Sequence, residues 1–128
     1  MSLHQSGEDY LEAILVLREK NGVVHSIDVA QHMGYSKPSV SRAVSVLKGE
    51  GYLTMEKDGR LELTETGVEV ARHIYERHSF LKQWLVHLGV SAGTAEEDAC
   101  KIEHNISDET FRCLKRHVDD MAAAVEGK

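Results

Sequence analysis

Three side chains in the last third of the chain have types and a spacing that suit a metal ion. Cys100, Glu103 and His104 stand at positions i, i+3 and i+4, so on a helix they share one face. A thiolate, a carboxylate and an imidazole together are typical ligands of transition metals. A surface Glu–His pair beside a buried cysteine gives the same pattern. The three residues therefore leave a metal site and a purely structural arrangement open.

Two acidic residues near the amino terminus and one histidine further along are candidates for the same chemistry. Asp9 and Glu12 form an i, i+3 carboxylate pair on the side of a predicted helix that faces away from its apolar stripe. A solvated helix start also explains them, because the helix dipole favours acids there. His78 interrupts an otherwise apolar stripe, where a histidine is commonly a satisfied core residue. The spacing alone leaves both interpretations open.

Hydrophobic periodicity predicts the elements that must position these residues. A period of 3.6 residues predicts helices over 8–20, 26–33 with Ser26 as N-cap, Lys37 to Glu50, 64–89, and two more that begin at a Thr94–Glu97 capping box and at Ser107. Between residues 53 and 64 the period changes to two, and Asp58-Gly59 predicts a tight hairpin. This order of elements is that of a winged helix-turn-helix.

The helix-turn-helix can be tested position by position. Counting from Ser26, the fifth residue is Ala30, where two closely crossing helices leave room only for a small side chain. The ninth is Gly34, which accepts the positive φ of the turn, and the fifteenth is Val40, which fills the corner between the helices. All three requirements are met, so the pattern predicts a DNA-binding module.

The length of the chain and the distribution of its charges indicate how the domains are organised. The 128 residues carry a net charge of −6, which argues against a protein that binds nucleic acid with its whole surface. Residues 35–60 carry a net charge of +2, whereas the other residues carry −8. We predict a mostly α fold with a small β-hairpin wing, in which a winged helix-turn-helix DNA-binding domain (1–66) precedes a helical metal-binding and dimerisation domain (67–128).

The outer face of the third helix and the tip of the hairpin are the predicted DNA contacts. They comprise Ser36, Lys37, Pro38, Ser39, Ser41, Arg42, Lys57 and Arg60. Arg42 suits a guanine, while the serines and Lys37 suit phosphates. One such module has too little area for tight specific binding, so we expect a homodimer on a two-fold, double-stranded DNA operator. A winged helix used only for protein contacts is the alternative.

Five segments of the chain resemble the diphtheria-toxin-repressor family of metal-dependent transcription repressors, and more closely its short two-domain manganese-regulator branch. They are Glu8–Ile14, Ser36–Ser41, Leu63–Gly67, Arg77-His78 with Leu81, and Ile102–Ser107. The resemblance implies a ligand set of Asp9, Glu12, His78, Cys100, Glu103 and His104. It implies two adjacent metal positions that are bridged by Glu103.

The sequence departs from both branches of that family. Cys100 stands where the manganese branch has a glutamate, and Asp9 stands where the iron branch has a methionine. Lys82 and Glu96 occupy positions of the iron branch's ancillary site. We expect Mn(II) or Fe(II) as cofactor, with Co(II), Ni(II) or Zn(II) able to substitute, because sulfur favours softer ions than Mn(II).

The function that these features predict is a repressor of metal-uptake genes. A divalent ion would tie the two units together so that the dimer binds a palindromic operator. Its dimer surface is expected to include Phe80, Trp84, Leu85 and Leu88. The alternative is a metal-independent winged-helix regulator that responds to an organic ligand or a partner protein. An enzyme is not expected, because no nucleophile–base–orienter set can be recognised. Two cysteines and no membrane-length apolar run suggest a cytoplasmic protein without membrane contact.

Overall fold

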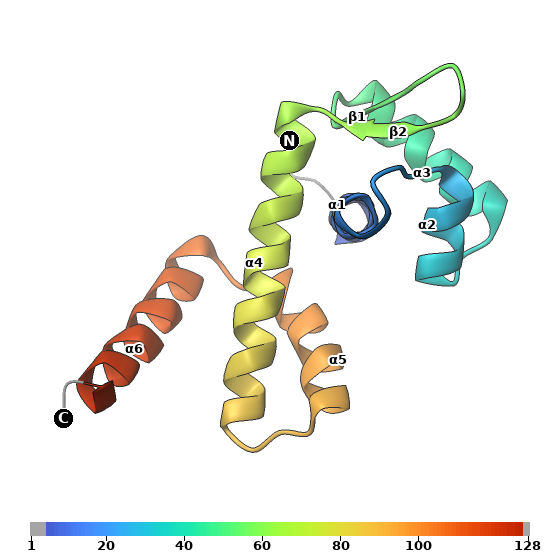
Figure 1. Ribbon diagram of the computed structural model, residues 1–128. Coiled ribbons are helices and arrows are strands. Elements are labelled where there is room, and N and C mark those ends of the chain that lie inside the picture. Colours follow the sequence, from blue (N-terminus) through green and yellow to red (C-terminus); the bar gives the residue numbers. More distant parts are fainter. Residues whose placement is uncertain (1–4, 127–128) are drawn as a thin grey trace. The chain divides into compact units, whose positions relative to one another are not determined.

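The computed structural model describes residues 5–126, and the chain divides into two compact units (Figure 1). The first is Met1–Ile74 and the second Tyr75–Lys128, so the division falls within one long helix. The elements in chain order are α1 (Gln5–Asn21), α2 (Ser26–Met33), α3 (Lys37–Gly49), β1 (Leu53–Met55), β2 (Leu61–Leu63), α4 (Glu65–His87), α5 (Ala92–Glu103) and α6 (Asp108–Glu126). No helix in this described part is long and apolar enough to cross a membrane.

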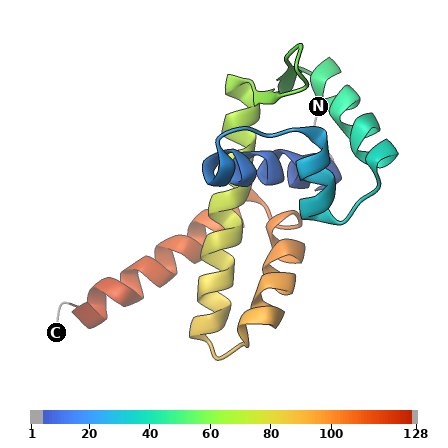
Figure 2. The ribbon, with the colours of Figure 1, turned by 45° about the vertical axis from the view of Figure 1, so that its right-hand side comes forward.

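The first unit gathers α1, α2, α3 and the hairpin together (Figure 2). Their buried apolar side chains form one core. Leu11, Ile14 and Leu15 on α1 are almost completely buried there. Their i, i+3, i+4 spacing places all three on one face of this helix. Burying a large aliphatic side chain contributes roughly 1.5–3 kcal/mol, so this stripe fixes α1 against the rest of the unit.

The helix-turn-helix has the predicted geometry at its three diagnostic positions. Ala30 and Val40 are buried, and Gly34 has φ = +72°, in the left-handed region that favours glycine. The predicted cap of α2 was wrong by one residue, because the N-cap is His25 rather than Ser26. The His25 backbone N–H donates to the Asp28 carboxylate over 2.8 Å, which places Ser26 inside the first turn.

The hairpin forms as predicted, with β1 and β2 antiparallel and Leu53 opposite Leu63. Gly59 at its tip has φ = +88°, and its N–H donates to the Glu56 carbonyl over 2.9 Å. Leu53 and Leu61 are buried in the core of the first unit. The two strands therefore attach the wing to the helices by their inward-facing leucines.

The start of α4 lies against the chain that leads into the hairpin. A Cβ atom built on Gly67 would lie 1.9 Å from the Tyr52 carbonyl oxygen, so no side chain fits there. The Thr64 hydroxyl donates to the Gly51 carbonyl over 2.7 Å and accepts from the Gly67 N–H at 3.1 Å. This close approach explains the glycine of the Leu63–Gly67 segment in structural terms.

The second unit has a small core formed by the carboxy-terminal half of α4 with α5 and α6. Leu81, Ala99 and Phe111 are buried in it, and the Phe80 ring meets Phe111 edge-on at 5.5 Å between centroids. Ser107 caps the last helix, α6, as predicted. Its hydroxyl oxygen accepts a hydrogen bond from the Thr110 backbone N–H at 3.1 Å.

The predicted start of α5 was wrong. The helix begins at Ala92 with Ser91 as N-cap, three residues before the Thr94–Glu97 box. The Ser91 hydroxyl donates a hydrogen bond to Thr94 Oγ1, one turn later, over 3.1 Å. Because Ser91 takes the extended conformation that an N-cap needs, Thr94 falls inside the first turn.

Candidate metal centre

A wholly buried carboxylate, that of Glu103 at the end of α5, is the centre of the candidate site. Its side chain has 0% exposure, and each oxygen faces a different imidazole. Oε2 lies 2.9 Å from His78 Nδ1, and Oε1 lies 3.1 Å from His104 Nε2. Both imidazoles are themselves largely buried. Burying a carboxylate costs several kcal/mol unless it is paired, so Glu103 depends on these neighbours or on a cation.

The hydrogen bonding of Glu103 Oε1 indicates whether a cation would fit at this site. Among the described residues no donor makes a well-aligned hydrogen bond to this buried atom, although the ring nitrogen of His104 is close. Cys100, Glu103 and His104 each offer one ligand atom, and these atoms lie within 4.8 Å of one another. Ligands at about 2.1 Å from one octahedral ion lie roughly 3 Å apart. The donor set therefore fits a transition metal.

The environment of His78 makes this imidazole a cation at neutral pH when no metal is bound. The hydrogen bond with Glu103 is the largest cause that raises its pKa, and the charges of Glu103 and Glu96 add to it against the opposing effect of burial. Together they raise the pKa of His78 to about 9. A bound metal ion would replace that proton as the positive charge beside Glu103.

A second carboxylate holds the other side of the His78 ring. Glu96 Oε1 lies 2.8 Å from His78 Nε2, and its Oε2 lies 2.9 Å from the Lys82 ammonium. The Lys82 hydrogen bond is the main cause that holds the pKa of the Glu96 carboxyl below its usual range. These two residues were noticed in the sequence only as departures from a family pattern, and their link to His78 was missed.

Arg77 fixes the turn that follows Glu103. Its side chain is buried, and Nη1 donates to the carbonyls of Glu103 at 3.0 Å and Ile106 at 3.1 Å. The guanidinium also pairs with the Asp108 carboxylate and lies over the Phe111 ring, with Cζ 5.1 Å from its centroid. Sequence reasoning identified Arg77 only as part of a resembling segment, because these contacts join residues 26 or more positions apart.

The six predicted ligands fall into two groups. Four of them, His78, Cys100, Glu103 and His104, belong to the second unit. Within this group, Glu103 lies close to both His78 and His104, at the distances given above. Asp9 and Glu12 belong to the first unit, one turn apart on α1. Both are half-buried, unlike the fully solvated acids of an ordinary helix start.

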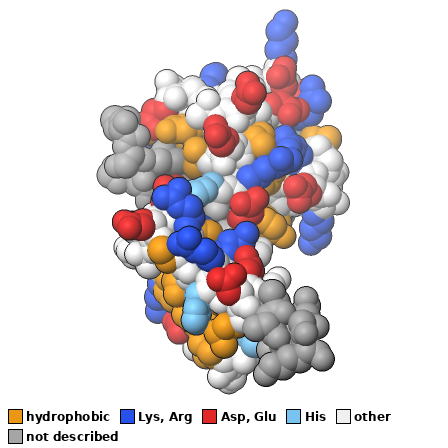
Figure 3. Space-filling model, turned by 90° about the vertical axis from the view of Figure 1, so that its left-hand side faces the viewer, with side chains coloured by type: hydrophobic (Ala, Val, Ile, Leu, Met, Phe, Trp, Pro, Cys, Tyr) orange, Lys and Arg blue, Asp and Glu red, His pale blue; other side chains and the backbone are white. Residues whose placement is uncertain are grey.

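The predicted DNA contacts lie at the surface of the first unit. Most are exposed, namely Ser36, Lys37, Pro38, Ser41, Arg42 and Lys57. The Ser36 hydroxyl also caps α3 by accepting from the Ser39 N–H at 3.3 Å. Arg60 is paired with Asp58 at 3.0 Å, which partly neutralises the tip of the wing. Figure 3 shows basic and acidic side chains intermixed on one face of the molecule.

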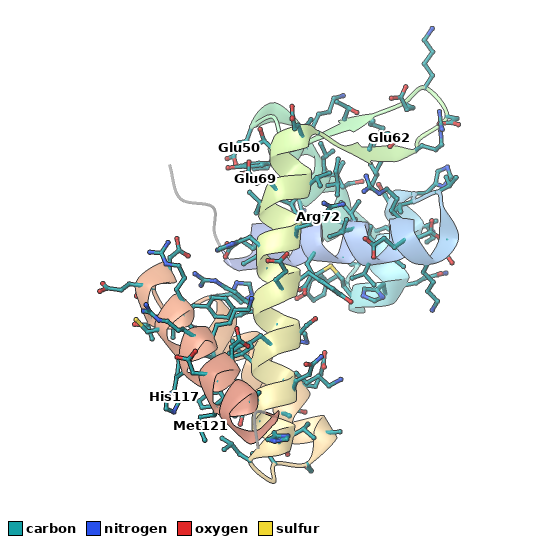
Figure 4. All side chains as sticks on the ribbon, turned by 60° about the vertical axis from the view of Figure 1, so that its left-hand side comes forward. Glu50, Glu62, Glu69, Arg72, His117 and Met121 are labelled. Carbon is teal, nitrogen blue, oxygen red and sulfur yellow. The ribbon has the colours of Figure 1, made fainter. Side chains whose placement is uncertain are left out.

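The residues predicted for the dimer surface differ in exposure. Phe80 and Trp84 are partly buried against the core of the second unit, and Leu85 is half-buried. Leu88 is 63% exposed and Met121 is 57% exposed. Met121 follows His117 by one turn on α6 (Figure 4). The unit thus leaves large apolar side chains at its surface.

Comparison with known proteins identifies both halves of the chain. The family model of the iron-dependent repressor N-terminal DNA-binding domain matches residues 2–61. The model of the iron-dependent repressor metal-binding and dimerisation domain matches residues 64–128. The matches follow each other along the chain in the predicted order.

Individual relatives agree with the family models. An uncharacterised HTH-type transcriptional regulator of Methanocaldococcus jannaschii is 37% identical over 115 residues, which cover 88% of this chain and 92% of the relative. The transcriptional regulator MntR of Escherichia coli is 34% identical, over 84% of this chain and 70% of its own length. The structure of the manganese regulator SloR matches with a TM-score of 0.79 and 29% identity over 93% of this chain. The chain spans 55% of that SloR chain.

These matches confirm the predicted mostly helical winged-helix fold and a divalent metal as cofactor. They also confirm the predicted function of a metal-dependent, DNA-binding transcription repressor, in a family of regulators rather than of enzymes. The chain belongs to the iron-dependent repressor family, in which the diphtheria-toxin-repressor resemblance of its motifs had placed it.

Proposed function

We propose that Glu103 bridges two divalent cations and that these cations couple the two units of the chain. The observation that carries the proposal is the burial of Glu103 between two imidazoles, with one carboxylate oxygen facing each ring. One cation would be held by Asp9, Cys100, Glu103 and His104. The other would be held by Glu12, His78 and Glu103.

The ligands of the first unit give the metal its regulatory effect. Asp9 and Glu12 are carried by α1, the helix whose other face forms the core of the DNA-binding unit. Without a cation, their carboxylates and that of Glu103 would repel one another if they were brought together. Because Glu103 would share one cation with Asp9 and the other with Glu12, the two cations would hold α1 at the metal-binding unit. Metal and DNA then raise each other's affinity, because both favour the same arrangement of the units.

Cys100 influences which metals suit the position formed by Asp9, Cys100, Glu103 and His104. Its thiolate is a softer ligand than a carboxylate and shifts preference from Mn(II) towards Fe(II), Co(II), Ni(II) or Zn(II). The three oxygen and nitrogen ligands that accompany it remain acceptable to Mn(II). We expect Mn(II) and Fe(II) to be the activating ions.

The regulated complex is a homodimer on a palindromic operator of metal-uptake genes, within the cytoplasm. Metal would set the separation of the two α3 helices near one turn of DNA, about 34 Å. Arg42 reads a base, and Lys37 and Lys57 contact phosphates. Phe80, Trp84, Leu85 and Leu88 contribute to the dimer surface.

The test is the metal dependence of DNA binding. A duplex selected from a random-sequence library in the presence of Mn(II) is titrated with protein, and fluorescence anisotropy is followed with Mn(II), Fe(II), Co(II) or a chelator. We expect at least tenfold tighter binding with Mn(II) or Fe(II) than with chelator. Glu103→Gln should abolish this difference, whereas Glu69→Gln, an exposed glutamate of α4, should preserve it. Equal affinity with and without metal would contradict the proposal.

A further inference from the structure

Lys82 and Glu96 form a chain of contacts that ends on the far side of the His78 ring. The Lys82 ammonium lies 2.9 Å from Glu96 Oε2, and Glu96 Oε1 lies 2.8 Å from His78 Nε2. The other ring nitrogen, Nδ1, faces Glu103 Oε2 at 2.9 Å. The imidazole is therefore held by one carboxylate at each nitrogen, and all four residues belong to the second unit.

The two carboxylates differ in what they can offer a cation. Glu103 is fully buried and faces a second imidazole, that of His104. Glu96 is 51% exposed, and its second oxygen is already occupied by an ammonium group. The Glu103 side of His78 therefore suits a divalent cation better, and a cation bound there would take the proton's place on Nδ1. Nε2 would keep its proton and donate a hydrogen bond to Glu96.

We propose that Glu96, held in place by Lys82, is a positioning residue that fixes the His78 ring with Nδ1 as the metal-binding nitrogen. The inference rests on the proposed role of His78 as a ligand. A carboxylate that accepts from the other nitrogen of a ligating histidine selects its tautomer, fixes its orientation and raises its basicity. The Lys82 ammonium favours the hydrogen bond of Glu96 with His78 over binding of Glu96 to the metal, because a carboxylate that already pairs with a cation competes less for a metal ion.

Metal affinity provides the first measurement. Loss of an outer carboxylate behind a ligating histidine typically weakens metal binding by about 10–100-fold. Because Glu96 is half exposed, Glu96→Ala should weaken Zn(II) binding at the lower end of that range, by about tenfold. Lys82→Gln should weaken it about two- to fivefold, as expected for loss of an exposed ion pair. Glu97→Gln is the matched control, an exposed glutamate at the next position of α5, and should leave affinity unchanged.

The second measurement identifies which ring nitrogen of His78 binds the metal. A merely structural role of Glu96 would not affect this choice of nitrogen. Long-range ¹H–¹⁵N correlation spectra of the full chain loaded with Zn(II), a diamagnetic ion, distinguish a metal-bound ring nitrogen from a protonated one. We expect His78 to be bound through Nδ1 and protonated at Nε2. Glu96→Ala should give a mixture of the two forms, and Glu96→Gln, which retains an acceptor oxygen, should restore mainly the first.

The outcomes separate this inference from the proposed function. If Zn(II) leaves the His78 ring nitrogens unchanged, His78 is not a ligand and both proposals are overturned. If Zn(II) binds His78 through Nε2, or if Glu96→Ala binds Zn(II) like Glu97→Gln with one unchanged tautomer, only the positioning role of Glu96 is overturned. Circular dichroism and thermal unfolding of each metal-free variant check that the fold is retained.

Discussion

His78 Nδ1 lies 2.9 Å from Glu103 Oε2, although the two residues are 25 positions apart in the sequence. The contact joins α4 to the end of α5 and places a buried negative charge beside an imidazole. In the metal-free protein a proton on His78 balances that charge. The metal and the proton therefore compete for one place, and this competition has consequences that can be measured.

Replacement of Glu103 by glutamine should remove most of the stabilisation that metal gives to the folded protein. A ligand at 100 times its dissociation constant stabilises a protein by about 2.7 kcal/mol. If the substitution weakens binding about 100-fold, the same metal concentration gives only about 0.4 kcal/mol. Thermal unfolding with and without Mn(II) measures both values. An equal metal-induced shift in Glu103→Gln and the unchanged protein would contradict a bridging Glu103.

The two cysteines should respond differently to Co(II). A thiolate bound to Co(II) gives a charge-transfer band in the near ultraviolet, so the loaded protein should absorb there. Cys100→Ser should lose the band, because serine cannot supply the thiolate. Cys113→Ser is the control, since Cys113 is an exposed cysteine of α6. A band that survives in Cys100→Ser and disappears in Cys113→Ser would show that Cys100 is not a ligand.

The stability of the metal-free protein should fall as the pH rises above neutrality. The pKa of His78 is raised from 6.5 to about 9, chiefly by its hydrogen bond with Glu103, so the folded state binds the proton more tightly than the unfolded state. This stabilisation is complete below pH 6.5 and is lost as the pH rises through about 9.

Urea unfolding in the presence of chelator, at several pH values across this window, measures the effect. His78→Gln should show a smaller decrease between pH 6.5 and 9 than the unchanged protein. Identical pH profiles for the two proteins would argue against the ion pair.

Gly67→Ala should destabilise the first unit severely. The new methyl group would lie 1.9 Å from the Tyr52 carbonyl oxygen, so α4 or the chain before the hairpin must move. Overpacking of this kind costs about 1–3 kcal/mol. Gly93→Ala is the control, because nothing lies within 4 Å of its added Cβ, and it should stabilise α5 by roughly 0.5–1 kcal/mol. Similar denaturation midpoints for the two variants would contradict the close approach at Gly67.

Local signals in the sequence predicted the elements of the DNA-binding unit, although they placed the N-cap of α2 one residue too late. Ala30, Gly34 and Val40 are separated by only ten positions, and their requirements are set by one turn between two helices. Ser36 and Ser107 act as caps because each bonds the backbone three residues later. The start of α5 was misjudged since Ser91 and Thr94 are both suitable caps, and sequence alone does not show which one is extended.

The site was less predictable because its contacts are long-range. The i, i+3, i+4 spacing indicated Cys100, Glu103 and His104, whereas adding His78 depended on the resemblance to a known family. Glu96 is 18 positions from His78, and no periodicity relates them. The role of Arg77 depends on carbonyl groups in a turn that forms only when α5 and α6 are in place.

The coupling of the two units by metal is tested most directly by the crystal structure of the full chain loaded with Mn(II) or Co(II), with ions located by anomalous scattering. We predict an ion bound by both Asp9 and His104, with Glu103 between it and a second ion that contacts Glu12 and His78. Ions held by residues of the second unit alone, with Asp9 and Glu12 away from them, would contradict the coupling.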